Sequence, residues 1–524
     1  MKICIVFLKT LDCASPKFEG VYRALGVSKW VARITMSGLS MSATPSVWGH
    51  WNGSATPSFV YTADQVGRDA ALAAVPPNTF SGKAQDGTAR GLREHSFHIG
   101  NDRVTLLGSN YATWRLRADE GGPKLLTDSD VDDVAGSHHT YGGGLGYLIG
   151  SSGSVLTTTA YNGSEAHLRA REFGCGYGRT TAPSTADGVS LTHTAAVMPG
   201  RDPAVLTEAF ITNAGSTTQL ISYREVWGTG MVHQLTGHGW GGWSRWHNLT
   251  TMLDRRAFTK AHFSSNFHNL STSSQAGMIQ AAVQSRRFLG LTAAERSFWA
   301  ASYEGTSPLP EGASLWDETP PAVFIAVLPT ITSGGPEPGA SLPRTGPTTF
   351  SNSAKDFYGT GGFVKPSGGH ATWRDAVAEG ETALISRTSI ELPPGASVTV
   401  RIVFGYLVGD EKASSQMEAI IQRAAASFGP LSTVPPPASV DPSSTVPTVP
   451  PAVRGSLADV ARARWAPLLT RARVSGAPWV ERELAWHSHV LLAGVSYDTH
   501  MNESIIDQGT AYRYYAGFQV GDLT

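Results

Sequence analysis

Hydrophobic and polar residues alternate over short runs between residues 97 and 409, which is the pattern of half-buried β-strands. The alternation is clearest in 219–228, where successive residues change between two faces. Similar strand-like runs lie at 103–108, 111–116, 189–198, 204–213, 322–330, 381–392 and 397–409. Because no helical period separates these runs, the sequence predicts large antiparallel sheets.

The period changes at residue 411. Over 411–428, the apolar residues Met417, Ile420 and Ala424 recur at the spacing of one helix face, which predicts a helix. Residues 430–453 are rich in Pro, Ser and Thr, and such a tract forms an extended linker rather than a helix or a central strand.

Two more helices are predicted after the linker. The first covers 456–474 and begins with a capping box made by Ser456 and Asp459. The second covers 479–497, and the short connection predicts an αα-hairpin. The remaining residues, 498–524, are predicted to form a polar and aromatic loop.

These changes of period give a mainly β fold class and divide the chain into four segments. The expected segments are an irregular N-terminal part (1–96), a β-sandwich domain (97–410), a linker helix with its Pro-rich linker (411–455) and a helical region (456–524).

Charge and composition narrow the class of ligand. The 41 basic and 42 acidic residues leave a formal net charge of −1, which provides no electrostatic footprint for nucleic acid or a membrane surface. Only 16% of residues are charged, whereas 57 glycines and 31 prolines are typical of a turn-rich β protein. A neutral polar ligand such as a sugar fits this balance, and neither a nucleic-acid nor a membrane partner is expected.

Cysteine usage and the N-terminal residues bear on location. Cys4, Cys13 and Cys175 are too few for a disulfide framework or a Cys-based metal site. The first apolar run is interrupted at Lys9 and has no good small-x-small cleavage motif, so it is a weak signal peptide. A cytoplasmic location is therefore favoured over secretion, although the sequence does not fix it.

Common catalytic signatures are absent from the sequence, including the P-loop, the GxSxG nucleophile elbow and HExxH. His487 and His489 stand two apart on a predicted helix, so they face different ways and cannot share a metal ion. The sequence predicts no metal site and no organic cofactor.

Residues 227–249 gather tryptophans and histidines among glycines. Trp240, Trp243 and Trp246 stand three apart, and indole rings stack on sugar rings, so they are candidate substrate-binding residues. The alternative, which the residue types alone favour, is an aromatic plug that seals a sheet against a neighbouring domain.

Carboxylates gather in the predicted C-terminal loop. Cleavage of a glycosidic bond needs one protonated carboxyl to donate to the leaving oxygen, while water or phosphate attacks the other face of the sugar. Asp507 and Asp522 are the candidate catalytic residues, and Gln508, Tyr512 and Arg513 are candidate sugar ligands. An ordinary charged loop is the alternative that the residue types alone favour.

The order of these elements resembles the cellobiose-phosphorylase family of inverting glycoside phosphorylases. The resemblance covers roughly residues 97–524 and is carried by segments that look like the family's sandwich strands, first barrel helices and acidic loop: 100–116, 207–227, 386–409, 481–494 and 507–522.

The resemblance implies a galactose-mutarotase-like β-supersandwich, a linker helix and an (α/α) barrel of six hairpins that begins at residue 456. It also implies an oligosaccharide or glucan substrate, inorganic phosphate as co-substrate and a homodimer. The family's acidic loop carries Arg-Asp, with a second Asp four residues later as general acid. Here Gly521 precedes Asp522 and the sequence ends at Thr524, so the general acid is not assigned.

The length of the helical region leads to a further expectation. Twelve helices with their loops need roughly 180 residues, whereas about 70 follow the linker. Two or three helices cannot bury their apolar faces alone. We therefore expect a truncated form of a longer enzyme, inactive in isolation.

Two functions remain open from the sequence. One is a glycoside phosphorylase or hydrolase that acts on β-linked gluco-oligosaccharides by inverting general-acid chemistry. The other is a non-catalytic carbohydrate-binding or oligomerisation sandwich. A structural β-protein without a ligand is a third interpretation.

Overall fold

A computed structural model gives the structure of the chain, in which residues 47–524 form one compact unit. All the residues that the structure describes belong to this unit. They are 49–61, 96–109, 114–118, 124–127, 143–158, 170–182, 185, 187–229, 232–233, 263–274, 277–288, 321–335, 341–359, 366–369, 376–378, 382–407, 413–428, 456–498 and 503–506.

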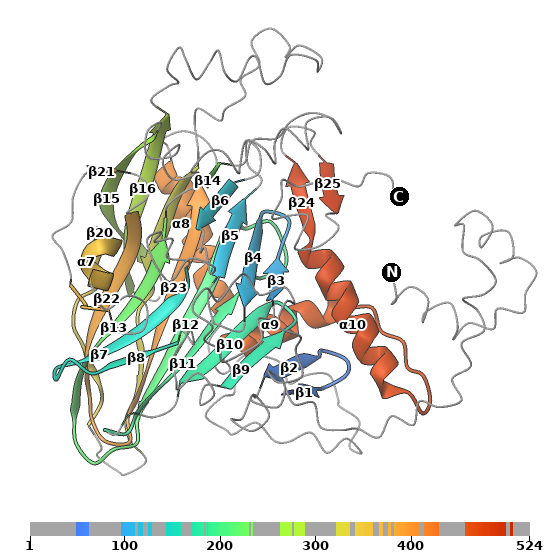
Figure 1. Cartoon of the computed structure of the whole chain (residues 1–524), viewed down its shortest axis with the longest axis horizontal. Coiled ribbons are helices and arrows are strands. Elements are labelled where there is room, and N and C mark those ends of the chain that lie inside the picture. The colour runs from blue at the N-terminus through green and yellow to red at the C-terminus, as the bar shows by residue number, and fades with distance from the viewer. Residues whose placement is uncertain are drawn as a thin grey trace, which may run out of the picture. The chain divides into compact units, whose positions relative to one another are not determined.

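The largest element is an antiparallel sheet of twelve strands, called here the large sheet (Figure 1). Its strands are β1 (Gly49–Asn52), β2 (Ser58–Tyr61), β9 (Ala170–Gly174), β10 (Tyr177–Ala182), β11 (Val189–Ala196), β12 (Ala204–Asn213), β15 (Phe263–Ser274), β16 (Gly277–Phe288), β17 (Ala322–Val327), β18 (Ile331–Ser333), β21 (Ala376–Ala378) and β23 (Ser397–Leu407). They lie in the order β1-β2-β9-β10-β11-β12-β23-β17-β16-β15-β21, and β18 pairs with β23.

Two smaller antiparallel sheets and a hairpin complete the β-structure. The six-stranded sheet has the order β19-β22-β13-β7-β8, with β20 paired to β22, and the five-stranded sheet has the order β14-β6-β5-β4-β3. Their bounds are β7 (Leu145–Gly150), β8 (Val155–Thr157), β13 (Gln219–Gly228), β19 (Arg344–Thr345), β20 (Thr349–Ser353) and β22 (Thr382–Leu392) for the former, and β3 (Ser96–Gly100), β4 (Val104–Ser109), β5 (Trp114–Ala118), β6 (Lys124–Thr127) and β14 (Val232–His233) for the latter.

The main hydrophobic core lies between the large sheet and the two smaller sheets. Alternation along β13 points Tyr223 and Trp227 into this core, while Val226 faces the other side of the sheet. Trp227 stacks on Phe404 of β23, with ring centroids 4.2 Å apart and an interplanar angle of 5°. The stacked antiparallel sheets that the sequence predicts are therefore confirmed, and the fold class is mainly β.

Helices cover the outer faces of two of these sheets. Helices α8 (Ala413–Phe428) and α9 (Leu457–Trp465) pack on the large sheet, and α7 (Ala354–Tyr358) packs on the six-stranded sheet. The described part of 47–524 thus has four layers in the order helix, sheet, sheet, helix (Figure 1). The helix face predicted for 411–428 is buried as expected, because Met417, Ile420, Ile421 and Ala424 all contact the large sheet's core.

Helix α9 is shorter than the sequence predicts. Ser456 is the N-cap, and its Oγ accepts a hydrogen bond from the backbone N–H of Asp459 at 3.4 Å, as expected. The α-helix ends at Trp465 and continues as the 3-10 turn η6 (Ala466–Leu468), rather than running to residue 474. Pro467 explains the difference, because proline has no N–H to donate along an α-helix.

The chain after α9 also departs from the expectation. Helix α10 (Pro478–Ala493) ends at Gly494, and β24 (Val495–Asp498) then pairs with β25 (Glu503–Ile506) in an antiparallel hairpin. The sequence predicted helix to residue 497 and loop beyond it. Apolar β-branched residues account for the hairpin, since Val495 stands opposite Ile506.

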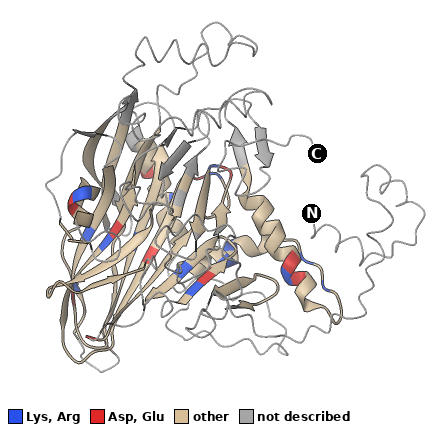
Figure 2. Cartoon of the chain, viewed as in Figure 1, with Lys and Arg blue, Asp and Glu red and all other residues tan. Residues whose placement is uncertain are grey.

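Strands also occur within the segment predicted to be irregular, because β1 and β2 extend the large sheet beyond β9. The three boundaries between the four predicted segments stay predictions, as does a six-hairpin barrel. No described helix is long and apolar enough to cross a membrane. Figure 2 shows charged residues on the strands beside α7, where β9 and β10 meet α9, and on α10.

Candidate functional site

The site residues predicted from the sequence lie outside the described part of the chain. They are Asp507, Gln508, Tyr512, Arg513 and Asp522 near the C-terminus, and Trp240, Trp243 and Trp246 in the tryptophan-rich segment. Their roles stay predictions. Asp507 directly follows Ile506, the last residue of β25.

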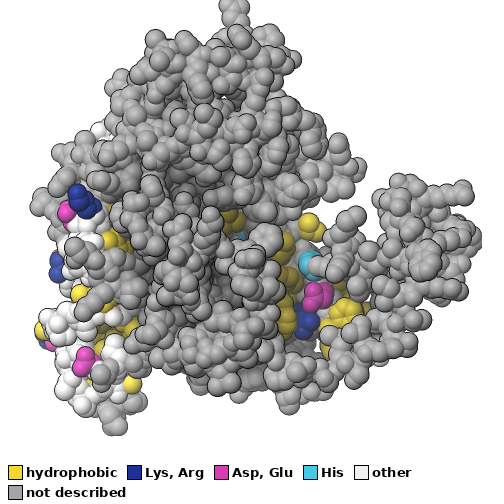
Figure 3. Space-filling view, in the orientation of Figure 1, with side chains coloured by type: hydrophobic (Ala, Val, Ile, Leu, Met, Phe, Trp, Pro, Cys, Tyr) yellow, Lys and Arg dark blue, Asp and Glu magenta, His cyan; other side chains and the backbone are white. Residues whose placement is uncertain are grey.

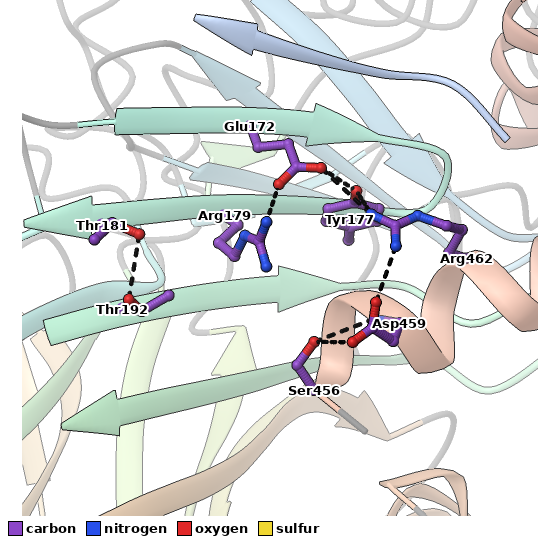
Figure 4. A network of polar contacts seen from close by, with 8 residues as sticks. All are labelled: Glu172, Tyr177, Arg179, Thr181, Thr192, Ser456, Asp459 and Arg462. Atoms are coloured by element: carbon purple, nitrogen blue, oxygen red, sulfur yellow. Dashed lines mark hydrogen bonds and ion pairs between the residues drawn. The ribbon is translucent and has the colours of Figure 1, made fainter. Parts of the chain in front are cut away.

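The described residues bring a different set of functional groups together, where α9 meets β9 and β10 (Figure 4). Glu172 of β9 is its centre. The hydroxyl of Tyr177 donates to Glu172 Oε1 at 2.6 Å, and Arg179 forms an ion pair with Glu172 Oε2. The fourth member, Arg462, reaches Glu172 from α9, with Nη2 3.4 Å from Oε1. We call these four residues the junction network.

Arg462 connects the junction network to the start of α9. Its Nη2 donates to the hydroxyl of Tyr177 at 2.6 Å, and its Nη1 donates to Asp459 Oδ1 at 2.9 Å. Asp459 accepts a further hydrogen bond from Ser456 Oγ at 2.8 Å. A continuous chain of polar contacts therefore runs from the N-cap of α9 to the hairpin β9-β10.

The charges in the junction network stabilise one another. Burial by itself raises the pKa of Glu172, but the charge of Arg179 and the hydrogen bond from Tyr177 outweigh it, so this pKa lies below its ordinary value. A carboxylate kept ionised in this way accepts hydrogen bonds and has no proton to donate. The junction network is thus suited to holding α9 on the sheet rather than to general-acid catalysis.

A second ion pair fixes the same helix. Glu208 of β12 and Arg401 of β23 pair at 3.1 Å, with 6% and 9% of their side chains exposed. The other carboxylate oxygen of Glu208 accepts the backbone N–H of Leu457 at 2.9 Å. Arg401 also lies over the ring of Phe428, the last residue of α8, at 4.9 Å. The end of α8 and the start of α9 therefore contact one buried pair.

Close packing at a turn completes the junction. Gly176, between β9 and β10, has a φ of +82°, and a Cβ there would lie 2.0 Å from the indole nitrogen of Trp465. That nitrogen donates to the carbonyl of Val197 at 2.9 Å. Only glycine at position 176 lets the last turn of α9 approach this closely.

The interior of the sandwich holds an acid–base pair of another kind. His193 Nε2 lies 2.9 Å from Glu225 Oε2, with 3% and 0% of the two side chains exposed. Tyr223 and Trp227 also donate to Glu225. Although burial by itself raises the pKa of Glu225, the charge and hydrogen bond of His193 lower it below its ordinary value. Because the described structure leaves no exposed surface on Glu225, we interpret this pair as a link between the two sheets.

Aromatic residues surround the inner face of α10. Trp486 lies 5.1 Å from Trp51 of β1, and Arg482 lies over the ring of Trp51 at 5.1 Å. Ser54 donates to Glu481 at 3.0 Å, which ties the β1-β2 turn to the helix. Trp51 and Trp486 are half-buried, and Trp479 is 36% exposed. Figure 3 shows hydrophobic, charged and histidine side chains next to one another over α10.

His489 is buried beneath this aromatic group. Its ring lies 4.9 Å from Trp465 and 6.1 Å from Trp486, and neither ring nitrogen has a hydrogen-bond partner among the described residues. Burial, aided by the nearby His98, lowers the pKa of His489 to about 3. The side chain of His487 is 35% exposed, so the prediction that the two histidines face different ways is confirmed.

The described ranges contain no group of three His, Cys, Asp or Glu side chains arranged to hold a metal ion. Cys175 is buried and its Sγ contacts the carbonyl of Pro57 at 3.6 Å. Burial raises the pKa of Cys175 to about 12, so this thiol is not a nucleophile at neutral pH.

Comparisons with known proteins give structural likenesses only. No protein-family model matches the chain, and no curated protein matches it. An aldose epimerase homologue from C. elegans is similar at 12% identity, over 61% of this chain and 100% of that one, with a TM-score of 0.27. A putative aldose 1-epimerase from Klebsiella pneumoniae is similar at 11% identity, over 62% and 81% of the two chains, with a TM-score of 0.26. A putative aldose 1-epimerase from Escherichia coli K12 has 8% identity, over 60% and 100%, with a TM-score of 0.23.

Sequence reasoning did not identify the junction network. Its members on the hairpin lie within 172–179, where one charged and one aromatic residue stand on each side of a Gly-Cys-Gly turn. That pattern was the available signal. The partner Arg462 is 290 residues from Glu172, and no local pattern connects the two.

Proposed function

We propose that this chain is a carbohydrate-active protein in which a β-sandwich carries the helices of a glycoside phosphorylase or hydrolase. The supporting observation is the hydrogen-bonded contact of α9 with the large sheet through Glu172, Tyr177 and Arg462. A sugar site formed between sheets and helices needs the two to be held rigidly, since small displacements of catalytic groups reduce rates strongly. The order of sandwich, linker helix and further helices is the order that the family resemblance implies.

In this proposal the substrate is a β-linked gluco-oligosaccharide, cleaved with inversion by phosphate or water. The test is to incubate the full chain with β-linked gluco-oligosaccharides, with and without inorganic phosphate, and to follow the products by NMR. Phosphorolysis with inversion gives an α-glycosyl phosphate, and hydrolysis with inversion gives the α-anomer of the free sugar. If neither product forms from any of these substrates, inverting cleavage of β-linked gluco-oligosaccharides by this chain alone is excluded.

The second candidate function is carbohydrate binding without catalysis. It is favoured by the half-buried Trp51 and Trp486 and the exposed Trp479 along α10, because indole rings stack on sugar rings. Calorimetry of the full chain with soluble β-glucan tests it. Trp479→Ala should weaken binding at least about tenfold, as loss of about 1.4 kcal/mol does. Leu342→Ala should not, because Leu342 is an exposed residue that precedes β19 of the six-stranded sheet. Equal binding by both variants would contradict this role for α10.

A further inference from the structure

Two arginines face each other on the outer side of the six-stranded sheet. Arg224 of β13 and Arg387 of β22 are directly opposite in the antiparallel register. Their side chains are on the same face, so their Cβ atoms lie about 5 Å apart. Like charges placed opposite one another on neighbouring strands destabilise a sheet. Figure 2 shows basic positions on these strands beside α7.

Nothing in the described part of the chain neutralises this pair. Neither guanidinium has a carboxylate partner there, and the only acceptors of Arg224 in that part are the carbonyls of Gly368 and Gly369. The Nε atoms of Arg224 and Arg387 are both buried without a hydrogen-bond partner. Arg224 is 5% exposed, and burial together with the charge of Arg387 lowers its pKa to about 10.

A third donor on this face also lacks an acceptor. Ser222 precedes Arg224 by two residues, so it shares the outer face, and its Oγ is buried without a hydrogen-bond partner in the described structure. Ser222 stands opposite Ser389 of β22, two residues from Arg387. Within the ranges that the structure describes, three unpaired donors and two positive charges therefore lie together without an anionic acceptor.

Packing keeps Arg224 in place. Its guanidinium lies 5.6 Å from the ring of Phe357 in α7. Gly368 has a φ of +69°, and a Cβ there would lie 2.9 Å from Ile149 and 3.6 Å from Nη1 of Arg224. The loop thus fits closely over the arginine, whose position is set before any ligand arrives.

We propose that Arg224, Arg387 and Ser222 bind an oxyanion, the phosphate or carboxylate group of a small ligand. Guanidinium groups pair with both through charge-assisted hydrogen bonds. The bound oxyanion supplies the missing acceptor and cancels the repulsion between the two arginines. The site is on the opposite side of the sandwich from α9, so it is independent of the function proposed above.

Thermal unfolding of the full chain in Tris–chloride at constant ionic strength tests the proposal. Inorganic phosphate and glucuronate are added in separate experiments. As the concentration of each anion is raised, sodium chloride is lowered to keep the ionic strength constant. A saturable rise in Tm with phosphate identifies a phosphate site, and one with glucuronate identifies a carboxylate site. No rise with either anion, or an equal rise with added chloride, overturns the proposal.

Variants distinguish this site from general salt effects. Arg387→Gln should bind the stabilising anion at least about tenfold more weakly, as expected for loss of a charged hydrogen bond, and in chloride alone it should unfold at the same or a higher temperature than wild type. Arg344→Gln is the matched control, because Arg344 is in the same sheet but opposite Glu391. Ser222→Ala removes only a hydroxyl and is the second test variant, in case Arg387→Gln does not fold. It should also weaken the response of Tm to the anion. An unchanged anion response in the folded variants would contradict the assignment.

Discussion

The carboxylate of Glu208, in the middle of the large sheet, accepts a hydrogen bond from the backbone N–H of Leu457, the first residue of α9. A negative charge at this place satisfies an N–H that has no partner within the helix and interacts favourably with the helix dipole. Burial nevertheless raises the pKa of Glu208 above its ordinary value. The charge of Arg401 and the N–H of Leu457 act against this effect of burial, and the sheet supplies the acceptor for the first N–H of the helix.

Removing this carboxylate should destabilise the protein. Glu208→Ala leaves Arg401 buried without its partner, and breaking a buried pair costs about 3–5 kcal/mol. Urea unfolding should show the loss in the free energy of unfolding. Arg423→Ala is the control, because Arg423 and Asp202 are 54% and 41% exposed, and the cost there should not exceed about 1 kcal/mol. Equal losses in the two variants would contradict the role assigned to Glu208.

Acid should weaken the fold through His489. Its pKa is about 3 in the folded chain and about 6.5 in the unfolded chain, so the unfolded state binds more protons between these values. The contribution of His489 to the free energy of unfolding is fully present above pH 6.5. It falls by about 1.4 kcal/mol per pH unit as the pH drops toward 3. At pH 5 the loss from this group is about 2 kcal/mol.

The contribution of His489 is measured by comparing variants. His489→Phe keeps an aromatic ring beside Trp465 but cannot take up a proton, so the loss of stability between pH 7.5 and pH 5 should be about 2 kcal/mol smaller than in wild type. His487→Gln, at a side chain that is 35% exposed, should retain the wild-type loss. The same pH dependence in all three proteins would show that His489 does not carry it.

Substitutions at two glycines allow the cost of backbone strain to be measured separately from the cost of a steric clash. Gly153 and Gly176 have similar φ values, +78° and +82°, but a Cβ on Gly153 meets nothing within 4 Å, whereas one on Gly176 would overlap Trp465. Gly153→Ala should cost about 1–2 kcal/mol from the left-handed backbone alone. Gly176→Ala should cost a further 1–3 kcal/mol, roughly, as overpacking does. Thermal or urea unfolding of both variants measures the difference between their losses in the free energy of unfolding. Equal losses would mean that α9 shifts to accommodate the added methyl group at no cost.

Shortening the Pro-rich linker should have little effect. Phe428 and Leu457 both contact the pair formed by Glu208 and Arg401, so the two ends of the linker are held at one place. Deleting 436–447 shortens the loop between Phe428 and Leu457 by less than half. The smaller entropy cost of closing this loop should raise the free energy of unfolding by about 0.6 kcal/mol or less. Urea unfolding measures this change. A loss of several kcal/mol would mean that the linker itself makes stabilising contacts.

Local pattern was enough to predict strands whose two faces differ or whose residues are nearly all apolar. The runs at 204–213 and 397–409 became β12 and β23, with ends that agree within two residues. The helix at 411–428 was predicted for the same reason, because one face of α8 is apolar and becomes buried. Such elements can be predicted from a single sequence because the pattern of apolar residues lies within the element itself.

Features that depend on distant residues were not predicted. The partners Glu172 and Arg462 come from segments 290 residues apart, and strand β1 pairs with β2 while its Trp51 packs on Trp486 of the distant helix α10. In each case tertiary contact decides what the local pattern leaves open.

Strands β12 and β23 lie between two hydrophobic cores, one on each face of the large sheet. One core is formed with the smaller sheets and the other with α8 and α9. Their amide protons are shielded from water by side chains above and below, so they can exchange with deuterium only when both layers separate together. Hydrogen exchange at these amides would therefore report the free energy of opening the whole molecule, while the hairpin β24-β25 would exchange through smaller, local openings.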